Sequence, residues 1–164
     1  MRGFLDLSND YERLNRNWCS AAHWYHEALA DELPNQRAMK FAVCMEVLFG
    51  SSGMRQGKGN ITAAISSLCN KCAEDVVSRN GWTIKECVKA IVKLRSRILH
   101  GNWEILNVEL GDDDGRIALK LTDFELFARI LLIGYTLEID KYMELVGRGD
   151  SAQDFLAWVA NSEA

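Results

Sequence analysis

The sequence predicts an all-α helical bundle of about five to six helices, forming a single domain over residues 1–164 with its core at about 9–146. Apolar residues recur every three or four positions in successive stretches, which is the spacing of one helix face. There is a single proline, so few positions would interrupt a helix. No fixed repeat or linker divides the chain, and this length suffices to bury a substantial core.

The first helix is expected to begin near Ser8 or Asn9 and to end at the break Asp31–Pro34. His23 and His26 lie three positions apart, so they share a face, and such a pair can ligate a metal. The alternative is two solvent-facing or interface histidines. The predicted core face consists of Tyr11, Leu14, Trp18, Ala21, Tyr25 and Ala28 or Leu29.

The second helix is expected at about Asn35–Phe49 with a broad apolar face, and Glu46 lies at the edge of that face. If this helix packs antiparallel to the helix that carries Arg95, the Glu46 carboxylate is the natural partner for a buried guanidinium. The alternative is a solvent-exposed pair of Glu46 with Arg37 or Lys40.

The segment Gly50–Gly59 is rich in glycine and serine and is expected to be a flexible loop carrying the cations Arg55 and Lys58. A third helix would follow, with Asn60 as its N-cap, and would end at Ser78–Gly81. Its predicted apolar stripe consists of Ile61, Ala64, Ile65, Leu68, Cys72 and Val76.

Cys69 and Cys72 form a lone Cys-x-x-Cys within this helical pattern, without a second cysteine pair. For that reason we expect neither zinc nor thioredoxin chemistry there, and no cofactor. A zinc site would have to recruit His23 and His26, which the sequence neither shows nor excludes. The five cysteines are an odd number scattered through helical segments, which favours reduced thiols in the cytoplasm over a disulfide framework.

The fourth helix has the strongest pattern. Thr83 and Glu86 form a predicted capping box, and Gly101 is placed where a helix would end. Arg95 falls on the apolar seam of this helix, where an arginine is costly unless it meets a carboxylate, a carbonyl or a phosphate. The apolar positions are Ile84, Cys87, Val88, Ile91, Leu94, Ile98 and Leu99.

His100 falls at the end of the same helix, where the backbone dipole favours a protonated imidazole. A fixed cation at Arg95 beside a titratable imidazole suits acid–base chemistry on a phosphate. The alternative is a histidine that merely ends the helix and an arginine that reaches the surface. Glu46, Ser96 and Asn102 are the candidate supporting residues.

A basic stripe accompanies these residues. Its members recur every four positions, without an acidic residue after Glu86, although the whole chain has a net charge of −4. An acidic chain is not a generic nucleic-acid-coating protein, so this local positive charge indicates a track for an RNA backbone. The alternative is an ordinary solvated lysine face. The stripe consists of Lys85, Lys89, Lys93 and Arg97.

Residues 103–110 and 116–121 alternate in polarity around the turn sequence Gly111–Gly115, so a short β-hairpin or extended loop is expected there. Thr122 and Glu125 give a second predicted capping box, which opens a long helix. Its Ala128–Tyr135 run is apolar nearly all round, which predicts burial between the core and a partner. A short last helix is expected at about 151–161.

The fourth helix resembles the HEPN superfamily. Arg95, four intervening residues and His100-Gly101, preceded by an apolar helix, are similar to its Arg-x4-6-His motif. The ApeA-like branch is most similar, because its last core helices tend to read as leucine, Arg-Ser, two apolar-biased residues and His-Gly. An upstream helix with Arg37…Phe41…Glu46-Val-Leu is in register with it, and the resemblance extends over about residues 18–143.

This resemblance implies a helical bundle that forms a homodimer, with Arg95 and His100 of both protomers at the interface. It implies a metal-independent endoribonuclease with RNA as its substrate, serving as a toxin or an antiviral-defence effector. One position departs from the pattern: active members often carry Asn, Asp or His directly after the arginine, where this chain has Ser96.

Other members are inactive or bind nucleotides. The alternative function is therefore a non-catalytic dimerisation or nucleotide/RNA-binding module of a defence or toxin–antitoxin system, with an antitoxin or an additional defence subunit as a further partner. The chain lacks a run of roughly 18 apolar residues and its N-terminus lacks the features of a signal peptide, so no membrane association and a cytoplasmic location are expected.

Overall fold

The computed structural model describes residues 12–49, 54–77, 81–100, 110–111, 117–145 and 149–162. Within them, helices dominate, which confirms the all-α class. The elements in chain order are α1 (Glu12–Ala30), α2 (Pro34–Leu48), α3 (Met54–Leu68), α4 (Ile84–Leu99), β1 (Leu110–Gly111), β2 (Ile117–Leu119), α5 (Leu121–Met143) and α6 (Ala152–Ser162).

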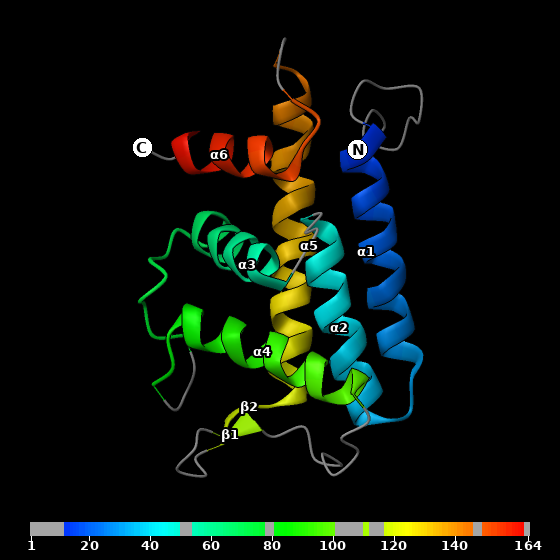
Figure 1. Ribbon diagram of the computed structural model, residues 1–164. Helices are drawn as coiled ribbons and strands as arrows, with labels where there is room; N and C mark the ends of the chain where they lie inside the picture. The colour runs from blue at the N-terminus through cyan, green and yellow to red at the C-terminus, as the bar shows by residue number, and fades with distance from the viewer. Residues whose placement is uncertain are drawn as a thin grey trace.

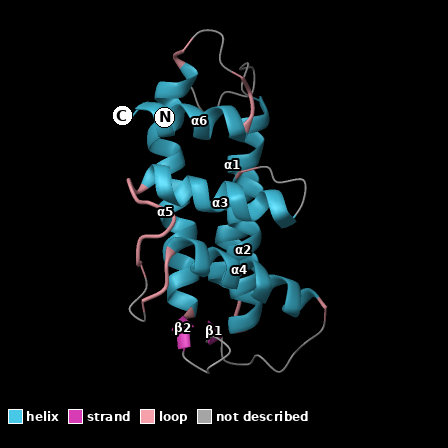
Figure 2. Cartoon of the chain, turned by 60° about the vertical axis from the view of Figure 1, so that its left-hand side comes forward, coloured by secondary structure: helices cyan, strands magenta, loops and turns pink. Residues whose placement is uncertain are grey.

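Two sets of helices cross each other in this bundle. In Figure 1, α1, α2 and α5 run roughly upright, whereas α3, α4 and α6 lie across them. Figure 2, turned by 60°, shows α3 and α4 stacked one above the other on the side that faces the viewer. α2 contacts α1, α4 and α5, and α3 contacts α4, α5 and α6.

The long helix α5 connects the two ends of the core. Tyr135 is fully buried, and its hydroxyl donates a hydrogen bond to the backbone carbonyl of Leu14 on α1 at 3.3 Å. Its ring lies 4.7 Å from the ring of Phe155 on α6. Aromatic side chains dominate core energetics because each removes a large apolar area from water.

Gly134 allows α3 to approach α5 closely. A Cβ atom at this position would lie 3.2 Å from Cβ of Leu68. That separation is tighter than ordinary carbon–carbon contact, so the absent methyl group permits the observed packing.

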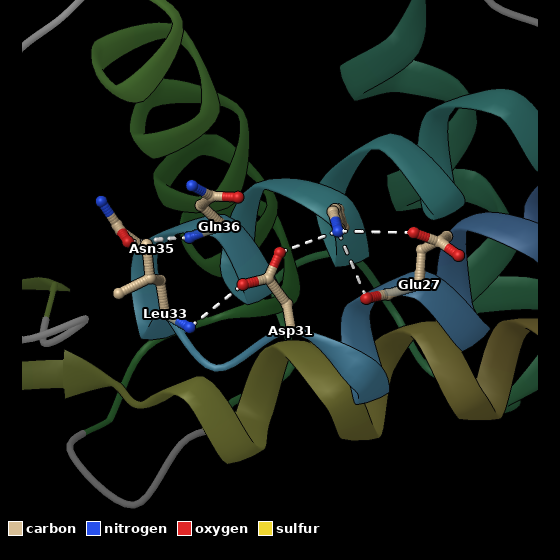
Figure 3. A network of polar contacts seen from close by, with 6 residues as sticks. Glu27, Asp31, Leu33, Asn35 and Gln36 are labelled. Atoms are coloured by element: carbon tan, nitrogen blue, oxygen red, sulfur yellow. Dashed lines mark hydrogen bonds and ion pairs between the residues drawn. The ribbon is translucent and has the colours of Figure 1, made fainter.

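The turn between α1 and α2 lies where the sequence predicts a helix break. The Asp31 carboxylate accepts a hydrogen bond from the backbone N–H of Leu33 at 3.0 Å and pairs with Lys40 Nζ at 2.8 Å (Figure 3). The hydrogen bond from Lys40 holds the pKa of Asp31 below its usual range. Pro34 then occupies the start of α2, where its missing N–H costs nothing.

The third helix differs from the prediction at both ends. It begins at Met54, so the expected loop is wrong over residues 54–59 and so is the N-cap at Asn60, whereas residues 50–53 lie outside the described ranges. The helix ends at Leu68 rather than near Ser78. Asn70 has φ 49, and the backbone N–H of Lys71 donates to the carbonyl of Ser66 at 2.8 Å. This is the Schellman arrangement that terminates helices, with asparagine in place of the usual glycine.

Two residues of the predicted apolar stripe are consequently solvent-exposed, because they lie beyond the end of α3. Cys72 is exposed, and Val76 is 61% exposed and forms an isolated bridge with Thr83.

Helix α4 confirms the capping-box prediction at its start. The Glu86 backbone N–H donates to the Thr83 hydroxyl at 3.3 Å, and the Thr83 N–H donates to the Glu86 carboxylate at 2.8 Å. At the other end, the C-cap is His100. The predicted apolar seam faces the core as far as Ile98, with Ile84, Cys87, Val88, Ile91 and Leu94 almost completely buried. The prediction is wrong for Leu99, which is 57% exposed at the end of the helix.

The predicted capping box of Thr122 and Glu125 is wrong. α5 begins at Leu121 with Lys120 as its N-cap, and the Asp123 carboxylate accepts the Lys120 backbone N–H at 2.7 Å. A carboxylate at the third helical position satisfies that N–H without a capping hydroxyl, so the helix starts two residues earlier than predicted.

Before α5, β1 and β2 pair antiparallel, with Leu110 opposite Leu119. Most of the predicted hairpin lies outside the described residues, so its extent stays a prediction.

One side of α5 packs against the core, and the other side is open in the described chain. Leu126, Ile133 and Leu137 are 43%, 53% and 64% exposed. Burial of this second side by a partner therefore stays a prediction. α6 begins after Ser151, whose hydroxyl accepts the Asp154 backbone N–H at 3.1 Å, close to the predicted position.

None of the helices in the described ranges combines the length and apolarity needed to cross a membrane.

Candidate functional site

The predicted pair of Arg95 and Glu46 is present. Arg95 Nη1 on α4 lies 3.3 Å from Glu46 Oε2 on α2, and the two side chains are 26% and 14% exposed. The antiparallel packing from which this pair was inferred is not found, since α4 crosses α2 steeply (Figure 1). The crossing point still brings the seam position of α4 against the edge of the apolar face of α2, which suffices for the contact.

The alternative partners of Glu46 are engaged elsewhere. Arg37 lies 3.7 Å from Glu125 on α5, and Lys40 pairs with Asp31 and Glu27 at the α1–α2 turn. Glu46 therefore holds Arg95 rather than a cation of its own helix.

The pair is incompletely satisfied. Arg95 Nε and Glu46 Oε1 are both buried without a hydrogen-bond partner in the described chain. Burial raises the pKa of Glu46 more than the neighbouring Arg95 guanidinium lowers it. An ion pair with an unpaired donor and acceptor contributes little to stability, because desolvation offsets the attraction. Its clear structural effect is to fix the orientation of Arg95.

His100 does not join this pair. It lies exposed at the end of α4, and its backbone N–H donates to the Ser96 carbonyl at 3.1 Å. Five residues along an ideal helix correspond to about 140° of rotation and about 7.5 Å of rise. Arg95 and His100 therefore leave α4 in different directions.

The remaining candidate residues lie around these two. Ser96 is half-buried, and the four members of the basic stripe, Lys85, Lys89, Lys93 and Arg97, are exposed. Lys85 Nζ lies 3.1 Å from the Glu74 carboxylate, so this cation is partly neutralised. Asn102 lies outside the described residues.

An open groove of about 570 Å³ lies between α3 and α4, and sequence reasoning missed it. Lys58, Thr62 and Ser66 line it from α3, and Lys85, Val88 and Lys89 line it from α4. The three α3 residues are spaced by four, so they share one helix face. This four-residue spacing predicts a shared helix face only if the helix begins before Lys58. Because a loop was predicted at Lys58, the groove was not predicted.

The histidines and cysteines considered for metal binding are not brought together. His23 and His26 are exposed on α1, whereas Cys69 and Cys72 follow α3, whose end lies on the opposite side of the bundle in Figure 1. Burial raises the pKa of the Cys69 thiol. In the described ranges, no three histidine, cysteine or acidic side chains gather as metal ligands would.

Comparison with family models, with curated proteins and with solved structures finds no match to this chain. The relation to HEPN domains stays a prediction from the sequence motif.

Proposed function

We propose that this chain is a metal-independent endoribonuclease of the HEPN type, serving as a toxin or an antiviral-defence effector. The observation that carries the proposal is the Arg95 guanidinium held by Glu46 at 3.3 Å, on the same helix as the exposed His100. The exposed cations of that helix favour an approaching phosphate chain, since they attract it electrostatically.

The proposed reaction is an internal attack of a ribose 2′-hydroxyl on the adjacent phosphorus. The new P–O bond forms as the bond to the 5′-oxygen breaks, which leaves a 2′,3′-cyclic phosphate and a free 5′-hydroxyl. His100 removes the 2′-hydroxyl proton or protonates the leaving oxygen. Arg95 stabilises the charge on the phosphoryl oxygens, where removing one such donor typically raises the barrier by about 3–4 kcal/mol.

A symmetric homodimer completes this site in our proposal. One histidine does not readily serve as base and acid in the same turnover, and Arg95 and His100 leave α4 about 140° apart. A second copy supplies the missing group, and twofold interfaces are the commonest kind. Many active HEPN domains carry Asn, Asp or His at the position of Ser96. In our proposal the Ser96 hydroxyl donates a hydrogen bond to the phosphate.

The direct test is cleavage of labelled RNA by the purified chain in EDTA. We expect cutting by the wild type and its loss, by two orders of magnitude or more, in Arg95→Ala and in His100→Ala. His23→Ala is the matched control, since His23 is an exposed histidine on α1. Unchanged circular dichroism in all variants separates lost chemistry from lost folding. Absence of cutting by the wild type under these conditions contradicts the proposal.

The second candidate function is a non-catalytic module that binds RNA or a nucleotide and dimerises. The divergence of Arg95 and His100 around α4 and the serine at position 96 favour it. Tight RNA binding without cleavage would support this alternative. Its further partner, an antitoxin or a defence subunit, stays a prediction.

A further inference from the structure

The groove between α3 and α4 has a polarity that is unusual for this acidic chain. Lys58 enters it from α3 and Lys89 from α4, and no carboxylate in the described chain forms an ion pair with either. At its edge, Lys85 is held by Glu74 at 3.1 Å. Two ammonium groups on facing walls, neither of them in an ion pair within the described chain, attract an anion that lies between them.

Two hydroxyl groups line the groove together with these cations. Thr62 and Ser66 continue the line of Lys58 along α3, each one turn further on, and both line the groove. Ser66 Oγ is buried and has no hydrogen-bond partner among the described residues. A hydroxyl without a partner at a basic groove is a donor for a phosphate or ribose oxygen.

Most of the remaining wall is apolar and consists of Val88 and the small residues Gly59, Ala63 and Ala73. The carboxylate of Glu74 also lines the groove, where it pairs with Lys85. Such a surface accepts the face of a sugar or a base, whereas a site for free inorganic phosphate requires donors on all sides. The groove is also open to solvent rather than enclosed, which suits a segment of a longer chain more than a small ligand that must be surrounded.

We propose that this groove binds the backbone of single-stranded RNA and leads it to the site on α4. Lys58 and Lys89 contact phosphates, and Thr62 and Ser66 donate hydrogen bonds to phosphate or ribose oxygens. This inference rests on the proposed function, because it names the path by which the substrate of that site arrives. It adds α3, which the basic stripe of α4 does not include.

The path is continuous along α4. From Lys89, the exposed cations Lys93 and Arg97 follow at four-residue intervals toward His100. Eleven residues of helix span about 16 Å. At about 3.4 Å per nucleotide in a stacked strand, that distance corresponds to roughly five nucleotides between the groove and the reacting phosphate.

The test measures binding separately from cleavage. The probe is a fluorescent RNA whose riboses are all 2′-O-methylated, so that no 2′-hydroxyl is available for attack. Its anisotropy is titrated with the full chain at several salt concentrations for wild type, Lys58→Gln and Lys89→Gln. Lys141→Gln is the matched control, because it removes the same charge from the distant end of α5.

Each groove variant is expected to bind the probe more weakly, irrespective of its base sequence. The slope of log K against log salt should fall by about 0.7 for each lost phosphate contact. Lys141→Gln should keep the wild-type affinity and slope.

Groove variants that bind like Lys141→Gln overturn the proposal, and so does a wild type that does not bind the probe. If the wild type cuts unmodified RNA while the groove variants bind normally, the proposed RNA binding by the groove is wrong and the proposed nuclease activity is supported. If binding depends on the groove but RNA is never cut, the proposed nuclease activity is wrong and the proposed RNA binding by the groove is supported.

Discussion

At the scale of single residues, Arg95 is positioned by one carboxylate that is itself poorly solvated. Glu46 is 14% exposed, and one of its oxygens has no hydrogen-bond partner in the part of the chain that the structure describes. Two consequences for stability follow, one from removing the carboxylate and one from its titration.

Glu46→Ala is expected to lower the free energy of unfolding by about 1–3 kcal/mol, because Arg95 loses its counter-ion. A fully buried pair would give about 3–5 kcal/mol, but the Arg95 side chain is 26% exposed and retains contact with water. Urea unfolding measures the difference. Glu32→Ala, an exposed acid in the α1–α2 turn, is the control and should be near neutral. An unfolding midpoint of Glu46→Ala equal to that of this control contradicts the expectation.

The titration of Glu46 should make stability depend on pH. Burial raises its pKa above the ordinary 4.5. The protonated form is thus favoured in the folded state, and the group's contribution to stability is full below pH 4.5 and falls as pH rises through the raised pKa. Glu46→Gln has no ionisable group at this position, so its stability does not decrease with pH for this reason. The stability of this variant relative to wild type should therefore improve between about pH 4 and about pH 7, as measured by urea unfolding at each pH.

If the stability of Glu46→Gln relative to wild type instead decreases as pH rises, the Arg95 guanidinium dominates and lowers the pKa of Glu46.

At the scale of elements, the ends of the helices depend on single capping residues. Asn70 ends α3 in the left-handed region with φ 49. Asn70→Ala should lower the free energy of unfolding by about 1 kcal/mol, because a side chain with an ordinary Cβ is strained there, whereas Asn70→Gly should be neutral or stabilising. For a chain of this size, the loss corresponds to about 2–4 °C in Tm, measurable by thermal circular dichroism. Equal Tm values for the two variants would exclude capping by this residue.

The sequence predicts the α4 helix well because its signals are local. A hydroxyl at Thr83 and a carboxylate three residues later form their bonds within one turn, and the apolar seam is long and regular. Arg95 is a polar residue on this apolar seam and therefore needs a carboxylate partner. That requirement predicted its contact with Glu46. The paired geometry could be anticipated for that reason, although the crossing direction of the helices could not.

α3 could not be placed because its determinants are weak or non-local. Glycines at its start normally favour loops, since they carry the largest entropy cost in a helix. Here the residues that follow pack into the core, with Ile61, Ala64 and Ile65 at most 2% exposed. This tertiary packing overrides the local preference, and the groove lined by Lys58 was hidden for the same reason.

At the scale of the whole molecule, the proposed chemistry requires two copies. A mixture of Arg95→Ala and His100→Ala chains is expected to recover only part of the wild-type cleavage. Their heterodimer brings one arginine and one histidine into the shared cleft, but it lacks the second histidine that would serve as acid or base in the same turnover. Random exchange gives about half of the dimers this composition. RNA cleavage after subunit exchange measures the recovery, and dimer mass by light scattering is the control. A strictly monomeric chain that nevertheless cuts RNA contradicts the shared site.

The connection between α3 and α4 has a consequence for the order in which the molecule assembles. The Val77 N–H donates to the Trp82 carbonyl, and the Lys85 N–H donates to the Ala73 carbonyl. These bonds join residues close in sequence, so closing their loops costs little chain entropy. Trp18 on α1, in contrast, reaches Thr136 on α5 across most of the chain. We therefore expect the two walls of the groove to come together early in folding, before α1 docks against α5.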